Sequence, residues 1–296
     1  MNPDGPSAGS GRRLTATAVA AELTRLTLRD HQLLIFLADH RTFTTEQLAD
    51  LTFGSIGRAR NRLNTLRSRN MLDRFRHYHR PGSQSWRWTL GPVGAAIVAT
   101  GRDEPWPRPA TVREATARLA LSPRLGHLIG VNGFFVALTA HSRTHPGTAL
   151  TRWWPEARAR KATGDAVRPD GHGVWAGPAR RVAFWFEHDT GTERLAIVAS
   201  KLAGYAHLAG TRHAYPVLIW LPTTVRETNL HTHLARAGIP AGVTVATAAA
   251  DHAGANNGPA GQVWRVAGRP DRLTLAGLPP TTLAGLDNPG GLSWDG

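Results

Sequence analysis

Three carboxylates in the second half of the chain have the types and spacing of a divalent-metal site. Asp170 follows a proline, and Glu187 and Asp189 lie two residues apart at the end of an apolar run. In an extended strand, residues two apart share a face, so Glu187 and Asp189 point to the same side of a sheet. If Asp170 lies on the neighbouring strand, its carboxylate meets that of Glu187 at one end of the sheet. We therefore expect Asp170, Glu187 and Asp189 to be metal ligands.

The chemistry expected of this site is metal-assisted attack on a phosphodiester. Carboxylate oxygens are hard ligands that suit Mg²⁺ or Mn²⁺. Such an ion polarises a scissile phosphate and lowers the pKa of a bound water molecule. Lys201 falls in the next predicted helix, where its charge can stabilise negative charge that develops on the phosphate. The predicted catalytic residues are Asp170, Glu187 and Lys201.

The same acids also have a plainer interpretation. Asp170 belongs to a Pro-Asp-Gly tripeptide, which is common in turns. Glu187 and Asp189 are then charges at a strand end that pair with arginines. On this interpretation the second half of the chain is a scaffold without chemistry of its own.

A second group of residues is basic. Residues 55–80 contain eight arginines against one acid, Asp73. Guanidinium groups suit both phosphates and guanine edges, so this segment is expected to bind double-stranded DNA. The predicted contacts are Arg58, Arg60, Arg62, Arg67, Arg69, Arg74, Arg76 and Arg80.

The elements that position these arginines have the order of a winged helix-turn-helix. Thr27 with Asp30, and Thr44 with Gln47, have the spacing of capping boxes ahead of apolar runs. Helices are expected over residues 31–39, 46–51 and 58–70, followed by a hairpin of strands 71–79 and 85–90. In such a fold the third helix enters the major groove and the hairpin contacts the backbone or the minor groove.

The elements that position the acids are of α/β type. Apolar runs and helical stripes alternate beyond residue 113. Strands are expected over 148–154, 166–175, 181–187, 215–221, 242–247 and 262–266, with helices over 125–141, 192–208 and 225–237. The fold class is therefore α/β with two domains.

Composition shifts along the chain suggest the domain boundaries. Three prolines between residues 101 and 109 are typical of a linker. We expect a flexible lead-in over 1–22, a winged-helix domain over 23–100, a linker over 101–112, an α/β domain over 113–268 and an irregular tail over 269–296.

The overall composition excludes several classes of protein. The 296 residues carry a formal net charge of +14 and contain no cysteine, so disulfides, thiol nucleophiles and cysteine-based zinc sites are excluded. No apolar run approaches the roughly 20 residues of a membrane helix, and no membrane partner is expected. No P-loop, Gly-X-Gly-X-X-Gly or Gly-X-Ser-X-Gly motif occurs. We expect a cytoplasmic protein, and homodimer formation is left open.

Residues 27–205 resemble the replication-relaxation family of actinobacterial plasmid proteins. The resemblance is carried by residues 28–34, 44–48, 72–75, 169–170, 187–193 and 201–205. It implies a winged helix joined to a nuclease-like domain, with a role in plasmid replication or in DNA relaxation and mobilisation during conjugation. It also implies a metal-dependent, relaxase-like activity.

The second half is similar to the PD-(D/E)XK nuclease core. The order helix, three strands, helix, strand, with Pro169-Asp170 and then Glu187, carries this resemblance. The core motif expects lysine two positions after the second acid, where this chain has Asp189. In some members of that superfamily the lysine lies on the following helix, a position that Lys201 would fill. The alternative is a decayed site on a surviving fold.

Three functions follow as hypotheses. The leading one is a plasmid DNA-processing protein that binds a duplex site through the winged helix and nicks or relaxes it with Mg²⁺ or Mn²⁺. The second is a non-catalytic replication initiator or origin-binding adaptor. The third is a winged-helix transcription regulator.

Overall fold

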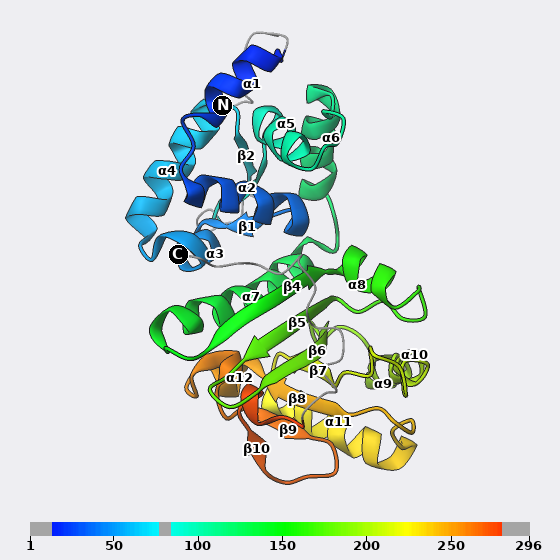
Figure 1. Cartoon of the computed structure of the whole chain (residues 1–296). Coiled ribbons are helices and arrows are strands. Elements are labelled where there is room, and N and C mark those ends of the chain that lie inside the picture. Colours follow the sequence, from blue (N-terminus) through cyan, green and yellow to red (C-terminus); the bar gives the residue numbers. More distant parts are fainter. Residues whose placement is uncertain (1–13, 77–83, 280–296) are drawn as a thin grey trace. The chain divides into compact units, whose positions relative to one another are not determined.

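A computed structural model of the chain describes residues 14–76 and 84–279. The protein is mixed α/β, and it divides into two compact units, Met1–Ser122 and Pro123–Gly296 (Figure 1). Within the described ranges, no helix is both long and apolar enough to cross a membrane. The two units are described separately below.

The first unit begins with helices, of which the first three have side-chain caps at their starts. Its first helices are α1 (Ala16–Leu23), α2 (Leu28–His40), α3 (Thr45–Leu48), a π-helical turn (Ala49–Phe53) and α4 (Ile56–Ser68). The Thr27 hydroxyl accepts the Asp30 amide at 3.3 Å, and the Asp30 carboxylate accepts the Thr27 amide at 2.8 Å. Thr44 and Gln47 form the same reciprocal pair at the start of α3. Both predicted capping boxes are confirmed.

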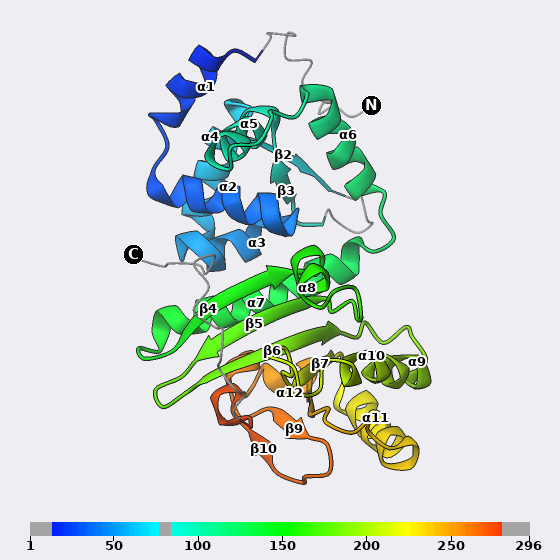
Figure 2. The ribbon, with the colours of Figure 1, turned by 45° about the vertical axis from the view of Figure 1, so that its right-hand side comes forward.

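A three-stranded antiparallel sheet completes the first unit together with two more helices. The strands β1 (Phe43–Thr44), β2 (Leu72–Phe75) and β3 (Arg87–Leu90) pair in the order β1-β3-β2. Helices α5 (Pro92–Gly101) and α6 (Pro109–Ala120) follow (Figure 2). The described strands are shorter than predicted, and residues 77–83, which include Arg80, lie outside the described residues.

The division between the units comes later in the chain than the composition suggested. Pro109 opens α6 instead of ending a linker. The Thr116 hydroxyl on α6 lies 3.1 Å from that of Thr89 on β3, which joins α6 to the three-stranded sheet. The first unit therefore extends to Ser122, beyond the segment 101–112 that was expected to connect two domains.

A buried ion pair joins α2 to α4. Asp30 is 1% exposed, and its two carboxylate oxygens accept hydrogen bonds from Arg62 Nε at 2.9 Å and Nη2 at 2.5 Å. Burial acts to raise the pKa of Asp30, but the hydrogen bonds from Arg62 and Thr27 outweigh it and leave the pKa below its usual value. One carboxylate thus caps α2 and orients α4.

The second unit is built on a seven-stranded mixed sheet. Its strands are β4 (Ala149–Pro155), β5 (Gly171–Ala176), β6 (Arg181–His188), β7 (Val217–Leu221), β8 (Val245–Ala249), β9 (Trp264–Val266) and β10 (Arg272–Leu273). They lie in the order β10-β9-β8-β7-β6-β5-β4. Pairing is antiparallel from β4 to β6, parallel from β6 to β8, and antiparallel from β8 to β10.

Helices cover both faces of this sheet. They are α7 (Leu125–Thr144), α8 (Glu156–Ala162), α9 (Leu195–Ser200), α10 (Leu202–Ala206), α11 (Thr224–Ala237) and α12 (Ala250–Ala253). On one face, Phe134 of α7 stacks on Phe186 at 4.0 Å between ring centroids. On the other face, Trp185 belongs to a buried cluster with residues of α8, α9, α10 and α11. Successive side chains of β6 therefore point alternately to the helices on the two faces of the sheet, as the sequence predicted.

The end of the chain is more regular than predicted. Residues 269–296 were expected to be irregular, but Arg272 and Leu273 form β10 on the edge of the sheet, and Leu275–Gly277 form a 3₁₀ turn. The prediction missed this strand because two residues are too few to show an alternating pattern. Residues 280–296 lie outside the described part of the chain.

The ion pair between Asp30 and Arg62 predicts a pH-dependent contribution to stability. Asp30→Asn is expected to lower the unfolding free energy of the first unit by about 2–3 kcal/mol at pH 7, because Arg62 loses its anionic partner while keeping some access to water. The folded pKa of Asp30 is lowered, so this contribution exists above the usual pKa of 3.8 and disappears as pH falls through the folded value. The difference between wild type and variant should shrink below about pH 4.

Hydrogen exchange of α2 and α4 amides under increasing urea, at pH 7 and at pH 3, measures this difference. An unchanged difference at the two pH values would show that the charge of Asp30 contributes nothing.

Candidate functional site

Asp170 and Glu187 come together where the β5–β6 ladder ends. Gly171 pairs with Phe186 in the antiparallel register, so Asp170, just before Gly171, comes beside Glu187, just after Phe186. The two side chains are buried, with exposed fractions of 9% for Asp170 and 5% for Glu187. The structure thus brings together the two acids that the sequence placed on neighbouring strands.

Asp170 is oriented from α7 and from the backbone of β6. Its Oδ2 accepts the His188 amide at 2.9 Å, and its Oδ1 lies 2.8 Å from His127 Nε2. Helix α7 can pack closely against His188 because it has a glycine, Gly130, at the point of contact. A Cβ at that position would lie 2.1 Å from His188 Nε2. The glycine therefore gives His127 its access to Asp170.

Glu187 is oriented from the opposite layer. The Tyr205 hydroxyl on α10 donates to Glu187 Oε1 at 2.6 Å, and Lys201 Nζ lies 3.6 Å from Oε2. The lysine also lies 3.1 Å from Glu193 Oε2. Burial and the charge of Glu187 raise the pKa of Tyr205 well above its ordinary value, so the phenol stays a neutral donor. This disfavours Tyr205 as a phenolate nucleophile.

The two carboxylates are electrostatically coupled. Burial, with the charge of Asp170 as the next cause, raises the pKa of Glu187 to about 8. Lys201 and the Tyr205 hydroxyl act in the opposite direction but do not compensate. The negative charge of Asp170 and Glu187 is therefore not fully compensated by neighbouring groups. Such a pair of carboxylates favours the binding of a cation or a proton.

Asp189 lies just beyond β6 and is engaged elsewhere. It forms an ion pair with Arg226 of α11, whose Nη2 donates to Asp189 Oδ1 at 3.0 Å. The same oxygen accepts the Gly191 amide at 2.9 Å. In the described ranges, no group of three or more His, Asp or Glu side chains is arranged to hold a metal ion. The role of Asp189 as a metal ligand stays a prediction.

The predicted DNA-contacting arginines fall into two groups. Arg62 and Arg69 hold the first unit together through ion pairs with Asp30 of α2 and Glu22 of α1. The others are placed toward the surface of α4 or near β2: Arg58 and Arg60 are exposed, Arg67 is half-buried, and Arg74 and Arg76 lie over the indole of Trp86. Arg80 lies outside the described residues.

Sequence reasoning missed His127 as a neighbour of Asp170. It lies far from the other site residues in the chain and at the start of a helix whose stripe is otherwise apolar. No spacing in the sequence relates His127 to the acids, because His127 comes close to Asp170 only when α7 packs on the sheet. Glu193 was likewise assigned no role, although it lies within the segment 187–193.

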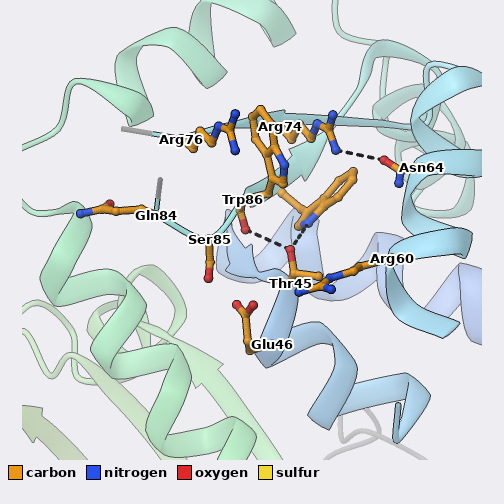
Figure 3. A pocket seen from close by; sticks show the side chains of 10 residues that line it. Thr45, Glu46, Arg60, Asn64, Arg74, Arg76, Gln84, Ser85 and Trp86 are labelled. Carbon is orange, nitrogen blue, oxygen red and sulfur yellow. Dashed lines mark hydrogen bonds between the residues drawn. The ribbon is translucent and has the colours of Figure 1, made fainter. Parts of the chain in front are cut away.

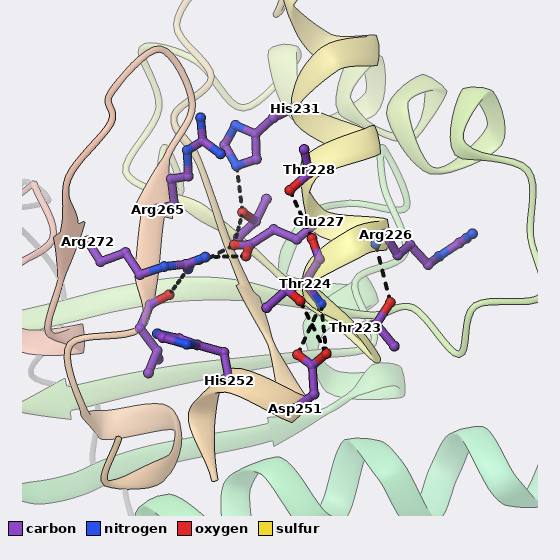
Figure 4. A network of polar contacts seen from close by, with 12 residues as sticks. Thr223, Thr224, Arg226, Glu227, Thr228, His231, Asp251, His252, Arg265 and Arg272 are labelled. Carbon is purple, nitrogen blue, oxygen red and sulfur yellow. Dashed lines mark hydrogen bonds and ion pairs between the residues drawn. The ribbon is translucent and has the colours of Figure 1, made fainter. Parts of the chain in front are cut away.

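A further buried acid lies in the same unit and has a structural role. Glu227 of α11 is 1% exposed and accepts hydrogen bonds from Arg272 at 3.1 and 2.5 Å and from the Thr247 hydroxyl at 2.7 Å (Figure 4). His231 Nε2 lies 2.7 Å from the same hydroxyl. The network ties α11 to β8 and β10, so it fixes the edge of the sheet.

Comparisons with known proteins complete these observations. The model of the replication-relaxation family matches residues 34–218 of the chain. The matched region includes both α4 and the residues around Asp170, Glu187 and Lys201. Searches of curated proteins and of solved structures found no significant match.

The coupling between the acids can be measured directly. Asp170→Asn removes a neighbouring negative charge and is expected to lower the pKa of Glu187 from about 8, whereas Lys201→Gln removes a positive charge and is expected to raise it. Lys161→Gln, on the exposed face of α8, is the matched control and should leave the titration unchanged. Carbon-13 NMR of labelled glutamate side chains between pH 4 and 10 follows the shift. Identical Glu187 titrations in wild type and Asp170→Asn would refute the coupling.

Proposed function

Because the chain belongs to the replication-relaxation family, we propose that it processes plasmid DNA, binding a duplex site and nicking one strand with a divalent metal. The membership supports a role related to plasmid replication or relaxation. The DNA-binding and strand-cleaving roles are assigned to the first and second units, respectively. The observation that carries the catalytic assignment is the coupled pair of Asp170 and Glu187 beside Lys201.

The first unit is proposed to be a winged helix-turn-helix. The order α2, α3, α4, β2, β3 is that of such a domain, with α4 in the place of the recognition helix. Arg58 and Arg67 of α4 would face the major groove, whereas Arg60 would contact the backbone. Arg74 and Arg76 at the end of β2 would contact the backbone. Arg62 and Arg69 would act indirectly by holding α4 in place.

The second unit is proposed to have a PD-(D/E)XK-like core. The order α7, β4, α8, β5, β6, α9, α10, β7, with β6 and β7 parallel, supports this assignment; α8 is an addition between the first two strands. Asp170 precedes the second strand of that core and Glu187 lies near the end of the third. Lys201, between α9 and α10, takes the place of the lysine that the motif expects after the second acid.

The residues around the acids fit a divalent cation. Mg²⁺ is commonly held by one or two carboxylates, several waters and a substrate phosphate, so a pair of acids is a sufficient protein contribution. Burial and then the charge of Asp170 raise the pKa of Glu187, and a bound cation would act in the opposite direction. Asp170 and Glu187 would hold the ion, which would polarise the phosphate and lower the pKa of a bound water.

The other side chains would then orient and balance the reaction. His127 and the His188 amide hold the Asp170 carboxylate, and the Tyr205 hydroxyl holds that of Glu187. Lys201 would stabilise the negative charge on the attacked phosphate. The water oxygen would bond to phosphorus as the water releases one proton to solvent, while the bond to one bridging oxygen breaks and that leaving oxygen takes a proton from solvent.

A second function is favoured by a different observation. Each of the three acids already has a protein partner: Asp170 has His127, Glu187 has Lys201 and Tyr205, and Asp189 has Arg226. Such satisfied carboxylates are also what a decayed nuclease core would keep for stability. The alternative is therefore a non-catalytic origin-binding adaptor.

Strand cleavage of a supercoiled plasmid carrying the cognate origin separates these functions. In the presence of Mn²⁺ the wild type is expected to convert the plasmid to open circles. Asp170→Asn and Glu187→Gln should each slow the conversion by about a hundredfold or more, since each removes a ligand of the ion. Lys201→Gln should slow it by roughly a hundredfold through loss of charge stabilisation.

The chain offers a matched control for the lysine. Lys161 is the only other lysine, and Lys161→Gln should cleave as the wild type does. A wild type that protects the origin in footprinting but leaves the plasmid closed, with and without Mn²⁺, would contradict the nuclease and support the adaptor.

A further inference from the structure

A cavity of about 350 Å³ opens in the first unit between α3, α4 and the β2–β3 hairpin (Figure 3). Its volume is at the lower end of the range of roughly 300–1,000 Å³ that is usual for ligand pockets. Three arginines, Arg60, Arg74 and Arg76, line it, and Glu46 is its one acid among the described residues. The cavity is therefore small, polar and positively charged.

A tryptophan holds two of these arginines in place. The guanidinium carbons of Arg74 and Arg76 lie 3.9 and 4.1 Å from the ring centroid of Trp86. In Figure 3 the indole stands between the two guanidinium groups. Two like charges repel, but the electron-rich faces of an indole attract both. Trp86 thus keeps the guanidinium groups of Arg74 and Arg76 close together.

Arg74 is fixed by further contacts. Its Nη1 donates to Asn64 Oδ1 of α4 at 3.0 Å, and its guanidinium also lies 5.4 Å from the ring of Trp88. The indole N–H of Trp88 in turn donates to the buried Thr45 hydroxyl at 3.0 Å. The orientation of Arg74 is therefore determined by α3, α4 and β3 together. A guanidinium oriented in advance loses less conformational entropy when it binds an anion.

The arrangement favours a phosphate over a nucleobase stacked on Trp86. In Figure 3 guanidinium groups stand on both sides of the Trp86 ring, so the indole is not offered as a stacking platform. The planar fork of donors on each arginine matches the paired oxygens of a phosphate. Arg60, on the exposed side of α4, lines the same cavity and adds a third charge.

We propose that this cavity is a built phosphate site that takes one phosphodiester of the bound DNA strand, with Trp86 as the residue that positions Arg74 and Arg76. The proposal rests on the DNA-binding function proposed above and specifies its chemistry. The contact of Arg74 and Arg76 with this phosphate then sets the position of α4 along the duplex, independently of the base sequence.

The salt dependence of binding tests this site in the full-length protein. The logarithm of the binding constant for a mixed-sequence duplex falls with the logarithm of salt concentration, with a slope of about −0.9 for each phosphate contact. Because Arg74 is the guanidinium that α3, α4 and β3 orient together, Arg74→Gln should abolish this phosphate contact, reduce the steepness of the slope by about 0.9 and weaken binding about eightfold at 0.1 M salt. Arg118→Gln, an exposed arginine of α6 outside the cavity lining, is the matched control and should keep the wild-type slope.

Two further variants separate positioning from folding. Trp86→Leu leaves every charge in place but should reduce the steepness of the slope as Arg74→Gln does. Trp86→Phe, which keeps an aromatic face, should keep most of the wild-type steepness. Glu46→Gln removes the repelling acid and should tighten binding. Circular dichroism verifies that each variant is folded.

The outcomes distinguish this proposal from the one on which it rests. A steep wild-type slope that Arg74→Gln leaves unchanged would overturn the phosphate site while DNA binding stands. A loss of affinity confined to particular base sequences, with the slope unchanged, would assign the cavity to base recognition instead and also overturn it. A flat wild-type slope would overturn the DNA-binding function itself.

Discussion

Two buried carboxylates held side by side are the constraint around which the second unit is organised. Like charges that leave water are costly unless other groups compensate them. The protein surrounds Asp170 and Glu187 with donors from both layers: His127 from α7 on one side, and Lys201 and Tyr205 on the other. The compensation is incomplete, since the pKa of Glu187 remains raised to about 8. Burial is the first cause of this shift and the charge of Asp170 the second, and perturbed pKa values of this kind cluster at functional sites.

Arginine has two distinct uses in this strongly basic chain. Some arginines satisfy buried acids and join elements, as Arg62 does for Asp30 and Arg272 does for Glu227. Others are held by tryptophans: the indole of Trp86 carries two guanidinium groups, and so does that of Trp154, with Arg152 and Arg158 at 4.9 and 5.0 Å. Net charge alone does not distinguish these uses, because the partner of each arginine decides which of its donors remain for a ligand.

The sequence predicted the local structure well and the long-range contacts poorly. Capping boxes and strand alternation act over three or four residues, so Thr27 with Asp30 and the two faces of β6 could be recognised directly. His127 and the commitment of Arg62 to Asp30 depend on packing between elements far apart in the chain. No spacing in the sequence encodes such contacts. The pairing of Asp170 with Glu187 was predictable because, in two consecutive antiparallel strands, the start of the first strand lies opposite the end of the second.

Binding of Mn²⁺ to the full-length protein, followed by the loss of the free-ion signal in electron paramagnetic resonance, determines whether Asp170 and Glu187 hold a metal ion. One ion is expected to bind per chain at pH 8, and that ion should be lost when Asp170 and Glu187 are together replaced by their amides. The measurement needs neither a DNA site nor turnover. Equal binding by wild type and the double variant, or no binding by either, would contradict the claim that these two acids form a metal site.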